Sequence, residues 1–258
     1  MNKITSISFS PCGSTKKTAN MIAEELAKKN GLNFEEALFT LPKDRENVKS
    51  FGKDELVVIA SPTYAGKLPN KIMPDFKEKL KGDNTPCIAV VTFGNRSFDN
   101  SLAELVSILK ANGFKVVSAA AIVNEHAFAH IGKLNETEIR EFASKINLEG
   151  EITEVDGDAD AAYYVPKKVD GEPAKFLPAK PLTDMNKCTK CMACARNCPM
   201  GSIDMTDPSL VPGICIKCHS CVNRCTKNAK YFDNEDLASH IKMLQENYSE
   251  EKTSKFYL

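Results

Sequence analysis

Hydrophobic residues form short continuous runs over the first 147 residues of the chain, and amphipathic stretches separate them. Three of these runs, residues 56–60, 87–91 and 116–123, consist almost wholly of apolar or small residues. Such runs are typical of parallel strands that are covered on both faces of a sheet. Together with two weaker candidates, they predict strands at residues 4–9, 33–39, 56–60, 87–93 and 114–123.

Helical periodicity fills the segments between the predicted strands. Apolar residues recur at helical spacing over residues 19–27, 102–109 and 139–146, and Gly113 follows the second of these patterns. Each pattern predicts a helix that buries one face, and a glycine just past the last turn is a common helix end. Five strands with intervening helices predict an α/β fold with a doubly wound parallel sheet.

The alternation of strands and helices stops near residue 148. Residues 151–158 are acidic, and four prolines lie between residues 166 and 181. This composition predicts a partly extended connector at residues 148–180, between a first domain at residues 1–147 and a cysteine-rich unit at residues 181–236. Residues 237–258 are predicted to form an amphipathic helix and a polar tail.

Composition narrows the class of protein. The 258 residues carry a formal net charge of zero, which argues against nucleic-acid binding by bulk electrostatics. We expect a cytoplasmic protein without a membrane span, because the first residues do not resemble a signal peptide and no apolar run reaches roughly 18 residues. Ten cysteines in such a chain indicate metal or redox chemistry rather than disulfides.

Eight of the ten cysteines form two groups with the same spacing, Cys-x2-Cys-x2-Cys-x3-Cys. Pro199 follows the first group, and the second group begins 27 residues after the first. In runs of this kind three cysteines bind one 4Fe–4S cluster and the fourth binds the other cluster. We therefore predict one cluster on Cys188, Cys191, Cys194 and Cys225, and a second on Cys215, Cys218, Cys221 and Cys198.

The cysteine-rich unit resembles the two-cluster bacterial ferredoxins over about 50 residues, which implies a small α+β domain. Two structural zinc sites are the alternative, although such sites usually pair Cys-x2-Cys knuckles across a longer spacer. Seven basic and two acidic residues lie between Lys187 and Lys230, whereas ferredoxins of this family are typically acidic. The excess indicates either a basic docking face for an acidic redox partner or ordinary solvated charges.

The segment after the first predicted strand has the composition of an anion-binding loop. Residues 10–18 read Ser-Pro-Cys-Gly-Ser-Thr-Lys-Lys-Thr and lead into a predicted helix, whose first N–H groups would face an anion. The loop lacks the glycine patterns of nucleoside triphosphate and dinucleotide sites, so a single phosphate fits best. Residues 61–69 and 92–98 follow two later strands, at the sheet edge where open α/β sheets bind ligands.

These three loops resemble those of flavodoxins, with Cys12 in place of the middle threonine of the phosphate loop. The resemblance implies a strand order of 2-1-3-4-5 and bound FMN, with Tyr64 as the best candidate to stack on the flavin. The residues implied for the phosphate are Ser10, Cys12, Gly13, Ser14 and Thr15, and those implied for the ring are Thr63, Tyr64, Ala65, Thr92, Phe93, Gly94 and Asn95. The whole chain looks like the flavodoxin–ferredoxin fusion proteins of anaerobic bacteria.

The resemblance implies an electron carrier with FMN and two 4Fe–4S clusters, which relays electrons to a partner such as a ferredoxin-dependent oxidoreductase or a hydrogenase. Such a carrier requires no catalytic residue. Alternatively, the chain is a flavin-dependent reductase in which Glu125, His126 or Tyr64 lines a substrate pocket. A third hypothesis is a redox-responsive interaction module that unfolds over residues 180–236 when the clusters are lost. The sequence leaves open whether flavin and clusters meet within one chain or across a dimer.

Overall fold

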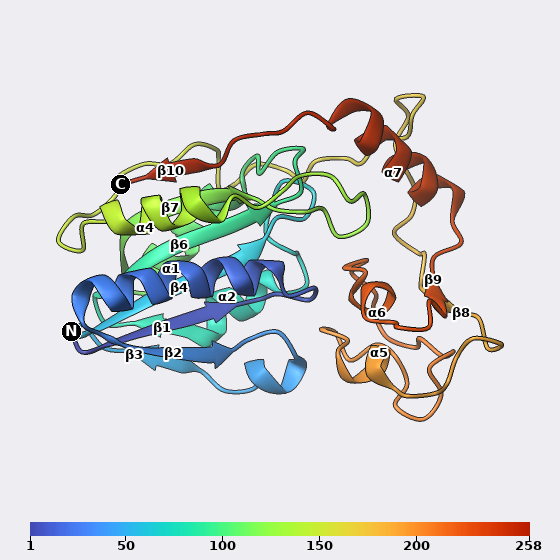
Figure 1. Ribbon diagram of the computed structural model, residues 1–258, viewed down its shortest axis with the longest axis horizontal. Helices are drawn as coiled ribbons and strands as arrows, with labels where there is room; N and C mark the ends of the chain where they lie inside the picture. The colour runs from blue at the N-terminus through green and yellow to red at the C-terminus, as the bar shows by residue number, and fades with distance from the viewer.

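The computed structural model describes residues 1–258, and its N-terminal part is a three-layer α/β domain (Figure 1). The predicted parallel sheet is confirmed, and five of its strands pair in parallel. Across the sheet they stand in the order β2-β1-β4-β6-β7, so that the order reverses between β1 and β4. Open α/β sheets generally bind ligands outside such a reversal. The five strands are β1 (Lys3–Ser8), β2 (Asn33–Leu38), β4 (Glu55–Pro62), β6 (Thr85–Phe93) and β7 (Phe114–Val123).

Helices cover both faces of the sheet and bury two separate apolar clusters. On one face lie α1 (Ser14–Asn30) and α4 (Glu136–Lys145), and on the other lie α2 (Met73–Lys79) and α3 (Ser101–Ala111). The side chains of β4 alternate between the two clusters, which is why its run of residues is apolar throughout. Each fully buried Val, Leu or Ile contributes about 1.5–3 kcal/mol to folding.

The five predicted parallel strands are all present, and the sheet has a sixth strand that the sequence did not predict. Strand β10 (Lys255–Tyr257) pairs antiparallel with β7 at the sheet edge, within the segment predicted as a polar tail. The rings of Phe256 and Phe142 stack with their centroids 4.6 Å apart. This contact with α4 fixes the end of the chain on the domain. Two further short strands, β3 (Lys49–Phe51) and β5 (Leu80–Gly82), pair beside the main sheet, and the 3-10 helix η1 (Pro42–Arg45) precedes β3.

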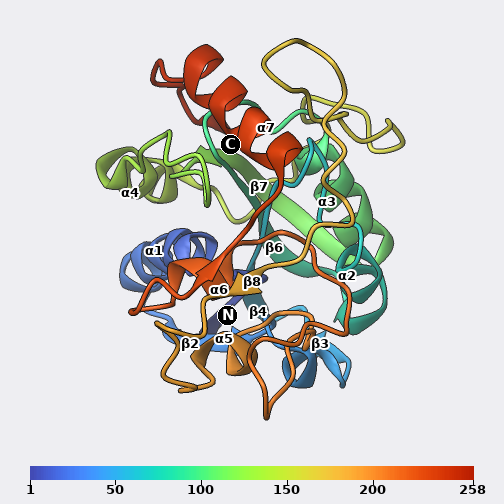
Figure 2. The ribbon, with the colours of Figure 1, turned by 90° about the vertical axis from the view of Figure 1, so that its right-hand side faces the viewer.

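The cysteine-rich unit lies beyond the C-terminal ends of the parallel strands, as Figure 2 shows from that side. Its two short helices, α5 (Ala193–Arg196) and α6 (Ser220–Asn223), repeat one another, and the strands β8 (Leu182–Thr183) and β9 (Lys230–Tyr231) form an antiparallel pair. Helix α7 (Glu235–Asn247) follows and begins at Asn234, whose side chain accepts a hydrogen bond from the Leu237 N–H. The chain then returns to the sheet edge as β10 (Figure 1).

Hydrogen bonds attach the cysteine-rich unit to the first domain. The Arg45 guanidinium donates to the Pro199 carbonyl oxygen over 3.0 Å, and the Ser220 hydroxyl donates to the Pro11 carbonyl oxygen over 2.8 Å. The unit is therefore held directly beside the loop that follows β1. None of the helices combines the length and apolarity that a membrane crossing needs.

Candidate functional site

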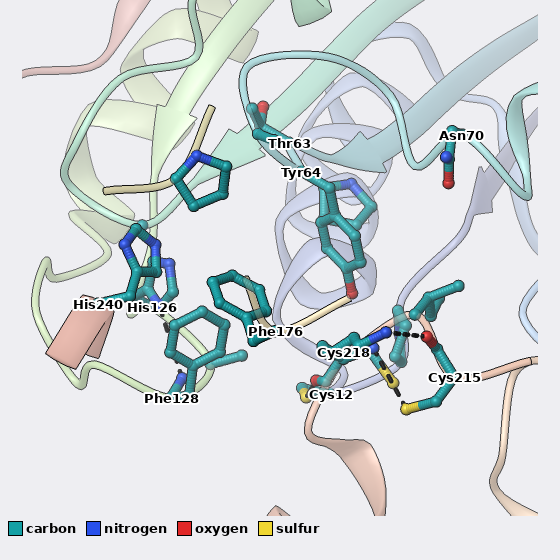
Figure 3. Close-up of a pocket in the computed structure, with 18 of the residues that line it drawn as sticks. Cys12, Thr63, Tyr64, Asn70, His126, Phe128, Phe176, Cys215, Cys218 and His240 are labelled. Atoms are coloured by element: carbon teal, nitrogen blue, oxygen red, sulfur yellow. Dashed lines mark hydrogen bonds between the residues drawn. The ribbon is translucent and has the colours of Figure 1, made fainter. Parts of the chain in front are cut away.

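A cavity of about 1010 Å³ lies at the C-terminal ends of the parallel strands (Figure 3). The loops after β1, β4 and β6 form one wall, and the second cysteine group forms another through Cys215 and Cys218. The connector contributes Tyr164 and Phe176, and helix α7 contributes His240. Segments of the first domain, the connector, the cysteine-rich unit and the C-terminal helix, which are far apart in the sequence, thus line one space.

The predicted phosphate loop contributes Ser10, Cys12, Ser14 and Thr15 to the cavity wall. Gly13 does not line the cavity, but its φ of 95° lets the chain turn into α1. The backbone N–H groups of Cys12, Ser14 and Thr15 have no acceptor elsewhere in the chain, whereas the Lys16 N–H donates to Ser10 Oγ. Three free donors at a helix N-terminus fit the phosphate of a bound FMN.

The loops after β4 and β6 bring the ring-binding candidates Thr63, Tyr64, Ala65, Thr92, Phe93 and Gly94 to the cavity. The Tyr64 ring projects into the space with its hydroxyl towards Cys12 and Cys218 (Figure 3). Burial and the neighbouring thiols hold the pKa of Tyr64 well above its usual range, so the hydroxyl stays protonated. A tight turn between Tyr64 and Lys67, with Gly66 at a φ of 77°, fixes the position of the ring.

Asn95 does not line the cavity. Its amide donates to the carbonyl oxygens of Tyr248 and Glu250, over 2.5 and 2.8 Å, and its oxygen accepts the Lys252 N–H over 3.0 Å. The side chain is fully buried by these contacts. In this structure Asn95 therefore holds the C-terminal segment against the loop after β6.

The sequence did not reveal the aromatic side of the cavity. Phe128, Phe176 and His240 gather there with His126, across the space from Tyr64 (Figure 3). The paired Tyr163 and Tyr164 also line the cavity. Two adjacent tyrosines in an otherwise acidic and proline-rich connector were the available signal, because large aromatic residues are rarely left in solvated linkers.

His126 is oriented by the backbone around it. Its Nδ1 accepts the Ala129 N–H over 3.3 Å, so that in the neutral ring the proton resides on Nε2. A Cβ atom on Gly94 would lie 2.3 Å from His126 Cδ2, which leaves room only for glycine beneath the ring. Burial, reinforced by nearby histidines and Arg96, lowers the pKa of His126 to about 3. The ring is thus a neutral hydrogen-bond donor beside the cavity.

The first cysteine set lies at a second, much smaller cavity. Cys188, Cys191, Cys194 and Cys225 all line it, which is the set predicted for one cluster. Cys191 is the only exposed member of the eight cysteines. No three His, Cys, Asp or Glu side chains converge on a point suited to one metal ion. The thiols instead surround a space.

Backbone N–H groups point at cysteine sulfurs in both halves of the repeat. The Lys190 N–H donates to Cys188 Sγ over 3.4 Å, and the Lys217 N–H donates to Cys215 Sγ over 3.5 Å. Lys190 and Lys217 have left-handed φ angles of 53° and 54°, so the two loops share one backbone shape. Similar bonds reach Cys198 from Ser202 and Cys225 from Ala229. Donors to sulfur are a means by which proteins hold and tune iron–sulfur clusters.

The second cysteine set lies deeper, against the large cavity. Burial raises the pKa of Cys215, Cys218 and Cys221, to about 12 for Cys221, and the nearby Cys198 thiol contributes to each shift. The Cys198 thiol is thus close enough to act electrostatically on the three thiols with which it is predicted to share a cluster. Buried thiols ionise when a bound cation compensates the cost, so the donor set fits iron.

Comparison with protein families identifies one segment of the chain. Residues 180–203 match the family model described as a 4Fe-4S binding domain. The chain therefore joins a flavodoxin-like domain to a 4Fe–4S binding domain, as in a flavodoxin–ferredoxin fusion. Comparison with curated proteins yields no match.

Among solved structures, a flavodoxin from the domain Archaea is similar, with 16% identity and a TM-score of 0.38. It covers 56% of this chain and 95% of its own. A flavodoxin of Streptococcus pneumonia TIGR4 has 17% identity and a TM-score of 0.38, and covers 55% of this chain and 96% of its own. Rubredoxin oxygen:oxidoreductase from Desulfovibrio gigas has 15% identity and a TM-score of 0.33, and covers 57% of this chain and 35% of its own. The flavodoxin-like fold is defined by the strand order β2-β1-β4-β6-β7.

Proposed function

We propose that the protein is an electron carrier that holds FMN and two 4Fe–4S clusters in one chain. The observation that carries the proposal is the shared cavity, which the predicted flavin loops and the second cysteine group line together. The Cys12 thiol of the phosphate loop donates to the Cys218 carbonyl oxygen over 3.2 Å. Burial raises the pKa of Cys12, which keeps the thiol a donor. Flavin and cluster would thus be neighbours within one chain.

The roles of this chain's residues follow from their positions. The N–H groups of Cys12, Ser14 and Thr15 would balance the phosphate charge, and Tyr64 would stack on the flavin ring. The eight cysteines would hold the clusters in the two predicted sets, of which the first lines the small cavity and the second borders the large one through Cys215 and Cys218. When bound, FMN exchanges one or two electrons and each cluster exchanges one, so the chain would join two-electron to one-electron chemistry.

The proposal assigns a task to each part of the chain. Residues 1–147 would bind FMN, residues 181–236 would bind the clusters, and residues 148–180 would close the cavity between them. Tyr163 and Tyr164 already contact the loop after β4, because the Tyr163 hydroxyl donates to the Leu68 carbonyl oxygen and the Tyr164 N–H to that of Ala65. Residues 237–258 would complete the cavity wall and the sheet. A ferredoxin-dependent oxidoreductase or a hydrogenase would be a suitable partner.

Anaerobic reconstitution followed by a redox titration tests the proposal. We expect about one FMN and about eight iron atoms per chain, with both flavin and cluster signals in UV–visible and EPR spectra. After rapid reduction of the clusters, electrons should reach the flavin at a rate that does not depend on protein concentration. A protein without flavin, or with iron far below eight atoms per chain, would contradict the proposal.

A flavin-dependent reductase is the second candidate function, and the geometry of His126 favours it. The neutral ring carries its proton on Nε2 and borders the cavity, where it could donate a hydrogen bond to a small oxidised substrate. Steady turnover of a small acceptor that falls in a His126→Phe variant, with FMN content unchanged, would support the reductase. Rapid transfer to protein acceptors without such turnover would support the carrier.

A further inference from the structure

The basic residues around the clusters separate into two sets in the structure. Three of the seven between residues 187 and 230 point their charged groups at the protein. Lys217 donates to the Leu177 carbonyl oxygen, Arg224 donates to that of Pro11, and the buried Lys230 donates to that of Pro208. The other four, Lys187, Lys190, Arg196 and Lys227, are exposed and their side chains donate to no carbonyl oxygen, whereas Arg224 is exposed but makes its bond to Pro11. The docking face considered from the sequence is therefore smaller than its composition indicates.

Two of the exposed lysines flank the exposed cysteine. Lys190 directly precedes Cys191, and Lys227 lines the same small cavity as Cys188, Cys191, Cys194 and Cys225. Thr189 and Thr226 are exposed beside them. The edge of the first cysteine set is thus a solvent-facing surface of small polar residues and positive charge.

Acidic residues do not neutralise this surface. Asp184 forms an ion pair with Lys187 over 3.1 Å. Lys190 and Lys227 form no ion pair. Asp207 receives hydrogen bonds from Ser209, and these, with a smaller contribution from Lys190, lower its pKa. Lys227 has no acidic side chain within ion-pair distance, so its charge faces solvent.

The second cysteine set, by contrast, lies on the inner side of the cysteine-rich unit, against the first domain. Cys218 borders the large cavity, and the adjoining His219 and Ser220 are buried against the first domain. The two sets therefore differ in exposure, with one facing the cavity inside the protein and the other facing solvent. Of the eight cysteines, Cys191 is thus the one that another protein could approach most closely.

We propose that the surface around Cys191, framed by Lys190 and Lys227, docks an acidic one-electron carrier protein. This inference rests on the proposed function, because it takes the first cysteine set as the ligands of a cluster. In each encounter the reduced partner loses one electron and that cluster gains one, without transfer of a proton or formation of a bond. Opposite charge on the partner accelerates the encounter and orients it.

Charge reversal at the surface tests the proposal. The test variant combines Lys190→Glu with Lys227→Glu, and its control combines Lys28→Glu with Lys53→Glu, which changes the net charge equally. Lys28 and Lys53 are exposed at the opposite end of the strands and form no ion pair. The probe is a reduced, strongly acidic bacterial two-cluster ferredoxin. Anaerobic stopped-flow measures the second-order rate of electron transfer, and calorimetry measures binding of the oxidised proteins.

We expect the test variant to transfer electrons roughly tenfold more slowly, or worse, at low salt. Its rate should also lose most of the salt dependence that the unaltered chain and the control show. Binding of the oxidised ferredoxin should weaken in parallel. Should the pair of substitutions lower iron content, Lys227→Gln removes the charge alone, and a severalfold slower transfer is expected.

An unchanged rate in a fully iron-loaded test variant, or an equal loss in the control, would overturn the docking surface. Tight binding of a single-stranded DNA oligonucleotide that the same substitutions abolish, with no effect on ferredoxin, would also overturn it and indicate a nucleic-acid surface. Iron content and reduction by dithionite are measured first on each sample. Absence of iron in the unaltered chain would count against the proposed function, whereas loaded clusters with an unaffected rate would count against the docking surface only.

Discussion

At the scale of single residues, His126 makes the stability of the folded protein depend on pH. The imidazole of the unfolded chain takes up a proton near pH 6.5, whereas the folded chain keeps the pKa of His126 at about 3. The neutral ring therefore favours the folded state in full above pH 6.5, and this contribution falls as the pH drops towards 3. We expect the urea midpoint of the holoprotein to decrease between about pH 7 and about pH 5.

A His126→Gln variant should lose part of that pH dependence, because glutamine does not titrate. His130→Gln is a matched control, since the His130 side chain is 62% exposed and makes only an exposed pair with Glu125. Equal pH slopes for the unaltered chain and His126→Gln would show that the ring is not responsible.

Some residue roles were accessible from the sequence and others were not. The thiol spacing and the Ser-Pro-Cys-Gly-Ser-Thr loop are local patterns, and the structure gathers most of those residues at the two cavities. Asn95 shows the limit of a local pattern. Its position after β6 suggested a contact with the flavin ring. Its amide instead forms hydrogen bonds with a segment more than 150 residues away. Only the tertiary fold determines which partner such an amide finds.

At the scale of elements, Lys67 binds the connector to the first domain while it forms a buried ion pair with Glu104. Lys67 Nζ lies 3.3 Å from Glu104 Oε1 and also donates to the carbonyl oxygens of Ala159 and Ala161. Lys67→Met would leave the Glu104 carboxylate buried without its partner, a change that typically costs about 3–5 kcal/mol. We expect a lower urea midpoint and faster proteolytic cleavage near residues 159–164.

Two further variants distinguish the ion pair from simple loss of a lysine. Lys67→Met with Glu104→Gln should recover part of the stability, because the buried charge is removed together with its partner. Lys17→Met breaks the exposed pair with Glu136 and should change the free energy of unfolding by only about 0–1 kcal/mol. The same loss in all three variants would argue against a special role for Lys67.

The long elements of the fold could be predicted because their patterns are long. Strands β4, β6 and β7 are buried almost throughout, and helix α1 buries one stripe, so periodicity identifies them. Strand β10 has only three residues and no apolar alternation that sequence could reveal. Its pairing depends on Phe256 meeting Phe142 and on Asn95 holding the segment that precedes it. Contacts between distant residues of this kind leave no local signal.

At the scale of the whole molecule, the proposed clusters and flavin would be coupled through the shared cavity. The loop of Cys215 and Cys218 lines the cavity, and the adjoining Ser220 and Arg224 donate to the Pro11 carbonyl oxygen beside the phosphate loop. Iron bound to this loop would hold it in place. We expect Cys218→Ala to weaken FMN binding by about tenfold, a change of about 1.4 kcal/mol, when measured by equilibrium dialysis with flavin fluorescence.

Cys191→Ala is the matched control for this coupling, because it removes a ligand of the other set on the solvent-facing side. FMN affinity should change far less in this variant. Equal loss of FMN from both variants would instead indicate that the cysteine-rich unit unfolds as a whole when either cluster is lost. Unchanged affinity in both would show that flavin binding is independent of the clusters.

The position of β10 also bears on how such a chain could arise or be divided. The cysteine-rich unit is tethered at both ends, by the connector before it and by the segment that leads to β10 after it. Along the chain, the unit therefore stands between the fifth parallel strand and the sixth strand of the same sheet. A gene split within the connector would leave the sixth strand on the cluster-bearing fragment. The two products would then complement one another as fragments of one fold rather than act as two independent carriers.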